Sequence, residues 1–123
     1  MHFESNLPIY LQIMNIIKDR IVSGKINGGD KLPSVRDFAQ DLKVNPNTVQ
    51  RAYQELEREN LVFTQRGMGT FVSREVDVLN SLKKNRAREI TQNFLKQMKK
   101  IGFKPAEILE IVSEWIAKEE DNS

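Results

Sequence analysis

The sequence contains no cysteine and only one histidine, and these two absences exclude several kinds of chemistry. Without cysteine there are no disulfides, no thiol catalysis and no cysteine-ligated metals. The single histidine, His2, follows the first methionine, where it is poorly placed for a metal site or a Ser-His-Asp triad. We therefore predict no catalytic residue, no metal site and no cofactor, and we expect that the protein is not an enzyme.

Long apolar runs and a strong excess of one charge are also missing. No apolar stretch approaches the roughly 18 residues that a membrane span needs, and Met1–Glu4 lacks the pattern of a secretory signal. We expect no membrane contact and a cytoplasmic location. The 123 residues carry 19 basic and 17 acidic side chains, so the net charge does not by itself indicate a nucleic-acid partner. Any positive surface must come from how the charges are placed.

Apolar periodicity predicts three helices in the first half of the chain. Isoleucines spaced by three and four residues predict a helix over 8–23. Ser34 has the residue type and spacing of an N-cap for a short helix over 35–42. Asn45 is the expected cap of a third helix over 46–60, which opens with a proline. Two helices separated by three or four residues are typical of a helix-turn-helix.

Two short β-prone segments follow the third helix. Residues 61–65 and 70–73 favour strands, and the residues between them contain two glycines. A hairpin directly after a helix-turn-helix is a wing. We therefore predict a mainly α fold with a small β-hairpin, in which residues 1–75 form a winged helix-turn-helix domain.

The start of the third helix presents side chains that could read DNA bases. Val49 and Ala52 belong to its apolar face, which leaves a polar face of Asn45, Asn47, Thr48, Gln50 and Arg51. Asn and Gln can each form two hydrogen bonds with adenine, and Arg can do so with guanine. The alternative is an ordinary solvated face. Arg36 in the preceding helix, together with Arg66 and Gly67 at the wing tip, favours the DNA interpretation because three elements would then face one duplex.

The ordered motifs in this region are those of a known family. They include Pro8-Ile9-Tyr10, Leu32-Pro33-Ser34-Val35-Arg36, Val44-Asn45, Thr48-Val49 and Gly67-Met68-Gly69-Thr70-Phe71-Val72. The run from Pro8 to Val72 closely resembles the DNA-binding domain of GntR-family bacterial transcription regulators. The resemblance implies a dimeric protein that binds palindromic operators. It also implies DNA contacts from Arg36, Asn45, Asn47, Thr48, Gln50, Arg66 and Gly67.

The remaining residues, 76–123, contain no strand signal and predict two helices, over 76–101 and from 105 onward. Two helices of this length cannot by themselves enclose a typical small-molecule pocket. The chain resembles the short-tailed YtrA-like subfamily, in which such helices serve dimerisation and the targets include ABC-transporter genes. The predicted dimer contacts are Phe94, Met98, Ile101, Ile108, Ile111, Val112, Trp115 and Ile116. The alternative is that these helices fold back on their own winged domain.

The sequence thus predicts a nucleoid-associated regulator, a repressor that binds palindromic double-stranded DNA as a homodimer. The rival hypothesis is a protein-interaction module that uses the winged helix as a scaffold. A basic cluster near the start of the long helix could contact phosphates or form a solvated face; it consists of Lys83, Lys84, Arg86 and Arg88. No residue cluster indicates a small-molecule effector.

Overall fold

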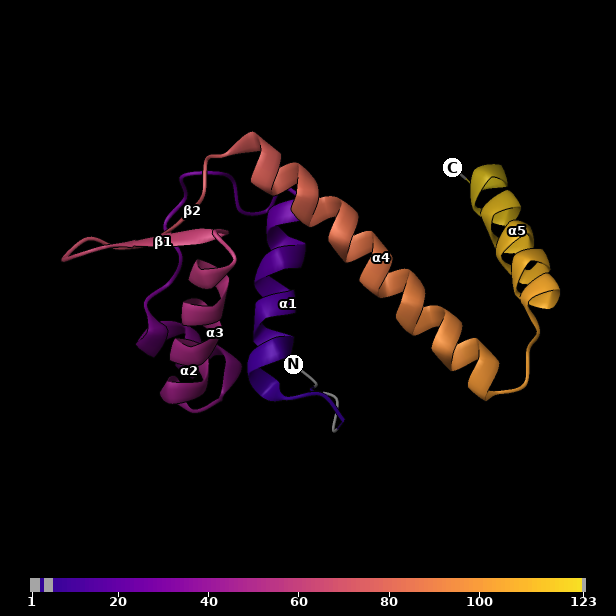
Figure 1. The fold of residues 1–123 in the computed structure, drawn as a ribbon, viewed down its shortest axis with the longest axis horizontal. Coiled ribbons are helices and arrows are strands. Elements are labelled where there is room, and N and C mark those ends of the chain that lie inside the picture. The colour runs from indigo at the N-terminus through magenta and orange to yellow at the C-terminus, as the bar shows by residue number, and fades with distance from the viewer. Residues whose placement is uncertain (1–2, 4–5, 123) are drawn as a thin grey trace. The chain divides into compact units, whose positions relative to one another are not determined.

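Five helices and a two-stranded antiparallel sheet make up the part of the chain that the structure describes (Figure 1). The computed structural model describes residue 3 and residues 6–122, so the predictions concerning His2 and Met1–Glu4 lie partly outside the described residues. The elements are α1 (Ile9–Val22), α2 (Val35–Leu42), α3 (Pro46–Arg58), β1 (Val62–Gln65), β2 (Gly69–Val72), α4 (Val76–Lys100) and α5 (Pro105–Asp121). The predicted fold class, a winged helix-turn-helix followed by two helices, is confirmed.

The helix-turn-helix is built from local signals. The Ser34 hydroxyl accepts a hydrogen bond from the backbone N–H of Asp37 at 3.0 Å and caps α2. The Asn45 side-chain oxygen accepts one from the N–H of Asn47 at 2.8 Å and caps α3. Between the two helices Lys43 adopts a left-handed conformation with φ of 57°, which ends α2 and reverses the chain. Glycine or asparagine is usual at such a position, so this lysine carries a small conformational cost.

The core of the winged domain lies around α3, which packs against α1, α2 and β1. Its most deeply buried side chains are Ile13, Ile17, Val49, Leu56 and Val72. The Tyr53 hydroxyl donates a 2.7 Å hydrogen bond to the carbonyl of Pro33, which joins α3 to the segment that leads into α2. Burial raises the pKa of Tyr53, and the nearby positive charge of Arg20 opposes that shift.

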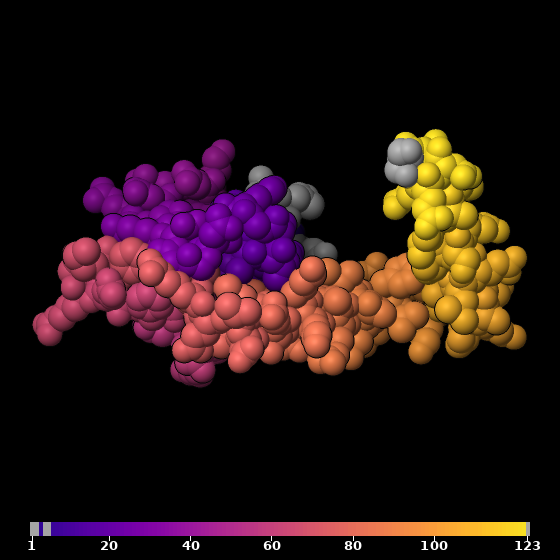
Figure 2. All heavy atoms as spheres, turned by 90° about the horizontal axis from the view of Figure 1, so that it is seen from above, coloured from indigo at the N-terminus to yellow at the C-terminus, as the bar shows by residue number. Residues whose placement is uncertain are grey.

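The hairpin projects from this packed body in both Figure 1 and Figure 2. Its register pairs Val62 with Val72 and Gln65 with Gly69. A segment before α2 extends the sheet, because the N–H of Leu32 donates to the carbonyl of Thr70 at 2.8 Å and Lys31 forms a bridge with Phe71. Strand β2 is therefore hydrogen-bonded on both of its edges, to β1 on one side and to the segment around Lys31 and Leu32 on the other.

The chain forms two compact units, of which the first ends at Arg86 and the second begins at Ala87. The first turns of α4 belong to the first unit because Leu82 is 5% exposed and joins the core. Arg86 is also buried and pairs with Asp19 of α1 at 2.7 Å. The sequence interpretation of Arg86 as a phosphate contact or a solvated charge is therefore wrong. The boundary after residue 75 between a DNA-binding domain and a dimerisation segment stays a prediction about function.

The second unit contains the later turns of α4 and the whole of α5. The N–H of Lys104 donates to the carboxylate of Glu107 at 2.9 Å at the start of α5. Ile108 is buried within this unit. Several large apolar side chains remain exposed, namely Ile90, Ile101, Leu109, Trp115 and Ile116. Within the part of the chain that the structure describes, no helix has the length and apolar character to cross a bilayer.

Candidate nucleic-acid interface

The start of α3 presents polar side chains on the side away from the core. Asn45, Asn47, Gln50 and Arg51 are exposed and Thr48 is half-buried. Val49 and Ala52, on the opposite side of the same turns, are fully buried. A buried apolar face therefore fixes the rotation of α3, and the polar face that the sequence predicts is the one that reaches solvent.

Arg36 and the wing tip are exposed on two further elements. Arg36 is the second residue of α2, two positions after the Ser34 cap. Arg66 and Gly67 lie in the turn between β1 and β2. Gly67 has φ of +77°, a conformation that favours glycine, and the space where a Cβ would lie is open. The absence of a side chain at Gly67 leaves the backbone of the wing tip accessible beside the Arg66 guanidinium.

Contacts that the sequence did not predict connect the wing to α3. The N–H of Thr64 donates to the Glu57 carboxylate at 2.9 Å, and the Thr64 hydroxyl lies 3.3 Å from that of Thr70 on the other strand. Phe63 and Phe71 stack with their ring centroids 5.7 Å apart. The Thr64–Glu57 hydrogen bond links the wing to α3, while the other two contacts join the two strands of the hairpin.

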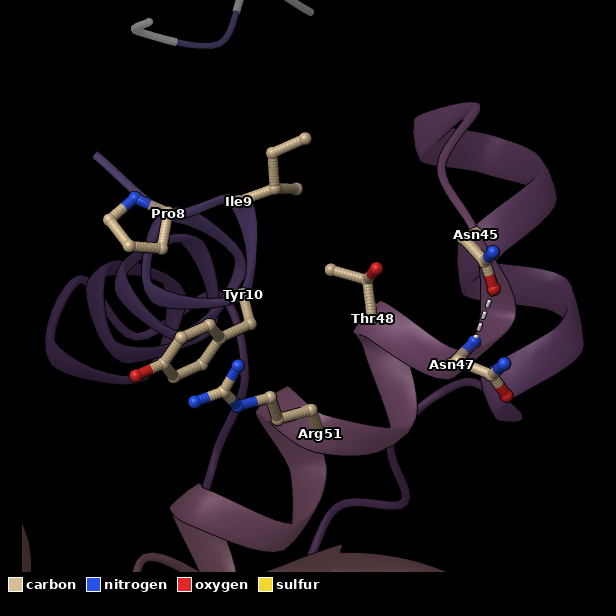
Figure 3. A pocket seen from close by; sticks show the side chains of 7 residues that line it. All are labelled: Pro8, Ile9, Tyr10, Asn45, Asn47, Thr48 and Arg51. Atoms are coloured by element: carbon tan, nitrogen blue, oxygen red, sulfur yellow. Dashed lines mark hydrogen bonds between the residues drawn. The ribbon is translucent and has the colours of Figure 1, made fainter. Parts of the chain in front are cut away.

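A cavity of about 370 Å³ separates the start of α1 from the start of α3. It is lined by Pro8, Ile9, Tyr10, Asn45, Asn47, Thr48 and Arg51, which Figure 3 shows. The guanidinium carbon of Arg51 lies 3.7 Å from the centroid of the Tyr10 ring, at cation–π distance. Tyr10 of α1 thus lies beside Arg51, and the predicted DNA-binding residues Asn45, Asn47 and Thr48 line the rest of the cavity.

Tyr10 and its neighbours in α1 were not among the predicted site residues. The sequence did contain a signal, because Tyr10 belongs to the Pro8-Ile9-Tyr10 motif, although its spacing from Ile13 and Ile17 also places it on the apolar face of α1. Its partner on α3 could not be predicted, since the pairing depends on how α1 packs against α3. Among the described residues, no group of three histidine or acidic side chains converges as a metal site would require.

Comparison with known families decides the identity of the winged domain. The family described as bacterial regulatory proteins, gntR family, matches residues 9–72, which is about half of the chain. The chain belongs to the GntR family. This family consists of transcription regulators and not of enzymes.

Relatives of this GntR chain include two proteins of Bacillus subtilis. The HTH-type transcriptional regulator YhcF is 48% identical over 108 residues, which cover 88% of this chain and 89% of YhcF. The HTH-type transcriptional repressor YtrA is 51% identical over 69 residues, covering 56% of this chain and 53% of YtrA. The likeness to YhcF therefore extends beyond the winged domain into the two C-terminal helices.

Solved structures show the same architecture. A GntR family transcriptional regulator from Listeria monocytogenes matches with a TM-score of 0.79 and 39% identity, covering 91% of this chain and 98% of that one. The DNA-binding domain of AraR in complex with its operator matches with a TM-score of 0.55 and 30% identity, covering 58% and 93%. The chain is a DNA-binding transcription regulator of the GntR family. The DNA contacts of its individual residues stay predictions.

Proposed function

We propose that this protein is a repressor that binds a palindromic operator as a homodimer in the bacterial cytoplasm, associated with the nucleoid. The observation that carries the proposal is the capped and exposed start of α3. Asn47 and Gln50 there face solvent, while Val49 and Ala52 on the other side are buried. N-terminal residues of a recognition helix are the ones that reach base edges in the major groove.

Two further elements support the same surface. Arg36 lies in the first turn of α2, the helix that braces a recognition helix against the DNA backbone. Arg66, with Gly67 beside it, stands on the wing, where an arginine can enter a narrow minor groove. We propose that these residues contact DNA together with Asn45, Thr48 and Arg51. The related winged domain of AraR has been solved in complex with an operator, which supports DNA as the partner of this kind of domain.

The homodimer is proposed from the apolar side chains of the second unit. Trp115 and Ile116 of α5 are 60% and 54% exposed, and Ile101 in the turn directly after α4 is 69% exposed. Full burial of such a side chain contributes about 1.5–3 kcal/mol. Exposed apolar clusters of this kind mark interaction surfaces. The predicted partner is a second copy of this chain, in contact with Phe94, Met98, Ile101, Ile111, Val112, Trp115 and Ile116, while Ile108 supports them from within.

The targets proposed are genes of ABC-type transporters, including the operon of the regulator itself. This part of the proposal follows from the resemblance to the short-tailed YtrA-like subfamily. The repressor role has support from the description of YtrA as a transcriptional repressor.

Binding of the full chain to its own promoter tests the proposal. A fluorescent palindrome from that promoter should bind far more tightly than a scrambled duplex of equal length at moderate salt. Specific sites are typically bound about 10³–10⁷-fold more tightly than non-specific DNA. Equal affinity for the two duplexes would contradict the proposal. If Arg36→Ala with Arg66→Ala left DNA affinity unchanged and abolished a protein complex, the protein-interaction hypothesis would replace it.

A further inference from the structure

Arg51 differs from the other exposed side chains of α3 because it stacks on an aromatic ring. Its guanidinium carbon lies 3.7 Å from the centroid of Tyr10, a half-buried residue in the first turn of α1. Ion pairs within the described residues include Lys18 with Glu59, Arg58 with Glu55 and Arg86 with Asp19, and Arg51 takes part in none of these. No carboxylate therefore neutralises Arg51 in the described part of the chain, and the guanidinium keeps its charge available.

The stack directs the Arg51 guanidinium toward α1, although Arg51 lies one turn after Asn47 on the same face of α3. Consecutive residues of an α-helix are rotated by about 100°, so Gln50 and Arg51 point to opposite sides of the direction of Asn47. Figure 3 shows the Arg51 side chain bent toward the Tyr10 ring, while the Asn47 side chain points away from both. Arg51 therefore faces the cavity at the edge of the recognition surface.

This cavity has the chemistry of a phosphate site. Its volume of about 370 Å³ has room for a phosphodiester, and its rim offers the Arg51 guanidinium and the Thr48 hydroxyl as donors. A guanidinium binds phosphate oxygens through two parallel hydrogen bonds, and it also stacks on aromatic rings. A ring that holds the side chain in place reduces the conformational entropy lost when DNA binds.

We propose that Arg51 binds a backbone phosphate of the operator and that Tyr10 is a positioning residue that holds the Arg51 guanidinium for this contact. Arg51 then contributes to affinity and to salt dependence, and it does not select a base. This changes the role that the sequence suggested for Arg51, which was a bidentate contact with guanine. The inference rests on the proposed DNA-binding surface of α3.

Salt-dependent binding of the full chain to its operator tests this assignment. Arg51→Ala should weaken binding about 10-fold and reduce the slope of log affinity against log salt by about one for each bound subunit. The preference for operator over single-base variants should not change. Tyr10→Leu should reproduce most of the loss of affinity, whereas Tyr10→Phe keeps the ring and should bind like the wild type.

Arg51→Lys separates charge from stacking. Lysine keeps the charge and therefore the salt slope, but it loses the planar fork, so affinity should still fall. Unfolding in urea identifies any variant that fails to fold. If Tyr10→Leu does not fold, the Arg51→Ala and Arg51→Lys pair still decides the phosphate contact, and Tyr10→Trp, which keeps an aromatic face, should retain wild-type affinity.

Two results would overturn the inference. One is a changed base preference in Arg51→Ala, which would make Arg51 a base reader. The other is wild-type affinity and slope in Arg51→Lys or in a folded Tyr10→Leu variant, which would make the stack irrelevant to binding. Failure of the proposed function has a different signature, namely a wild-type chain with no preference for operator over scrambled DNA.

Discussion

Arg86 of α4 donates two hydrogen bonds to the Asp19 carboxylate of α1, from Nε to Oδ1 at 2.7 Å and from Nη2 to Oδ2 at 2.9 Å. The Arg86 side chain is 10% exposed and that of Asp19 is 52% exposed. The residue before Asp19, Lys18, pairs with Glu59 at the end of α3 at 3.0 Å. Through the consecutive residues Lys18 and Asp19, α1 is therefore ion-paired both to the end of α3, at Glu59, and to Arg86 of α4.

Asp19→Asn should lower the free energy of unfolding by about 1–3 kcal/mol, because the buried Arg86 loses a charged hydrogen-bond partner. Because Asp19 is half exposed, this loss of unfolding free energy should be smaller than for a fully buried ion pair. Urea denaturation measures the change. Arg58→Gln is the matched control, since it breaks an exposed pair with Glu55 at 3.2 Å and should cost less than about 0.5 kcal/mol. If both variants lost the same free energy of unfolding, the burial of Arg86 would not strengthen its ion pair with Asp19.

Asn45 has two separable roles, as the cap of α3 and as a proposed DNA contact. Asn45→Ala should destabilise the protein by about 0.5–2 kcal/mol because the N–H of Asn47 loses its acceptor. Asn45→Asp keeps an acceptor and places a negative charge at a helix N-terminus, so stability should be retained. The same charge should weaken DNA binding by repelling phosphates. Wild-type DNA affinity in Asn45→Asp, measured by fluorescence anisotropy, would show that Asn45 does not face the duplex.

Tyr53→Phe should lower the free energy of unfolding by about 0.5–1.5 kcal/mol through loss of the hydrogen bond to Pro33. Burial raises the pKa of Tyr53 in the folded protein above its ordinary value of 10.0. The neutral hydroxyl is therefore favoured by folding, and its contribution is full below pH 10 and lost as the pH rises above that value.

Urea titrations of the wild type and of Tyr53→Phe across this range isolate the effect, since Tyr10 and the lysines are common to both. The stability difference between the two proteins should shrink at alkaline pH. A difference that stays constant would mean that Tyr53 ionises alike in the folded and unfolded chains.

Gln50→Ala should reduce discrimination at one base pair by about 1–3 kcal/mol without changing the salt slope, because a base contact carries sequence information and a phosphate contact does not. Competition binding with a set of single-base operator variants measures this. Gln54→Ala, one turn later on the same helix, is the control and should keep the wild-type preference. A uniform loss across all variants would reassign Gln50 to the DNA backbone.

Ile116→Glu should separate the proposed dimer. Ile116 is 54% exposed in the single chain, so the substitution leaves the monomer fold intact and places a charge in the buried interface. Sedimentation velocity should show a shift from dimer to monomer, with unchanged helical circular dichroism. Glu110→Ala, on the opposite, polar side of the same helix, should remain dimeric. A monomeric wild-type chain at concentrations that saturate operator DNA would refute the homodimer.

Much of the helix-turn-helix and the hairpin could be predicted because their determinants act over a few residues. The expected α2, over 35–42, matches the structure, and Ser34 and Asn45 both act as the predicted caps. The left-handed Lys43 was missed because residues of its type seldom take that conformation. The expected helices 8–23 and 46–60 were too long by one or two residues at their ends, where helices fray.

The sequence by itself determined which faces are apolar and which polar groups cap each helix, since periodicity and capping involve near neighbours. Only the tertiary structure decided the partners of Lys18 and Asp19, which lie 41 and 67 residues away along the chain. It also decided that Arg51 rests on Tyr10 and that Glu57 supports the wing. Such pairings depend on which helix surfaces pack against each other in the folded protein. The residue spacing within a single helix or strand does not predict that packing.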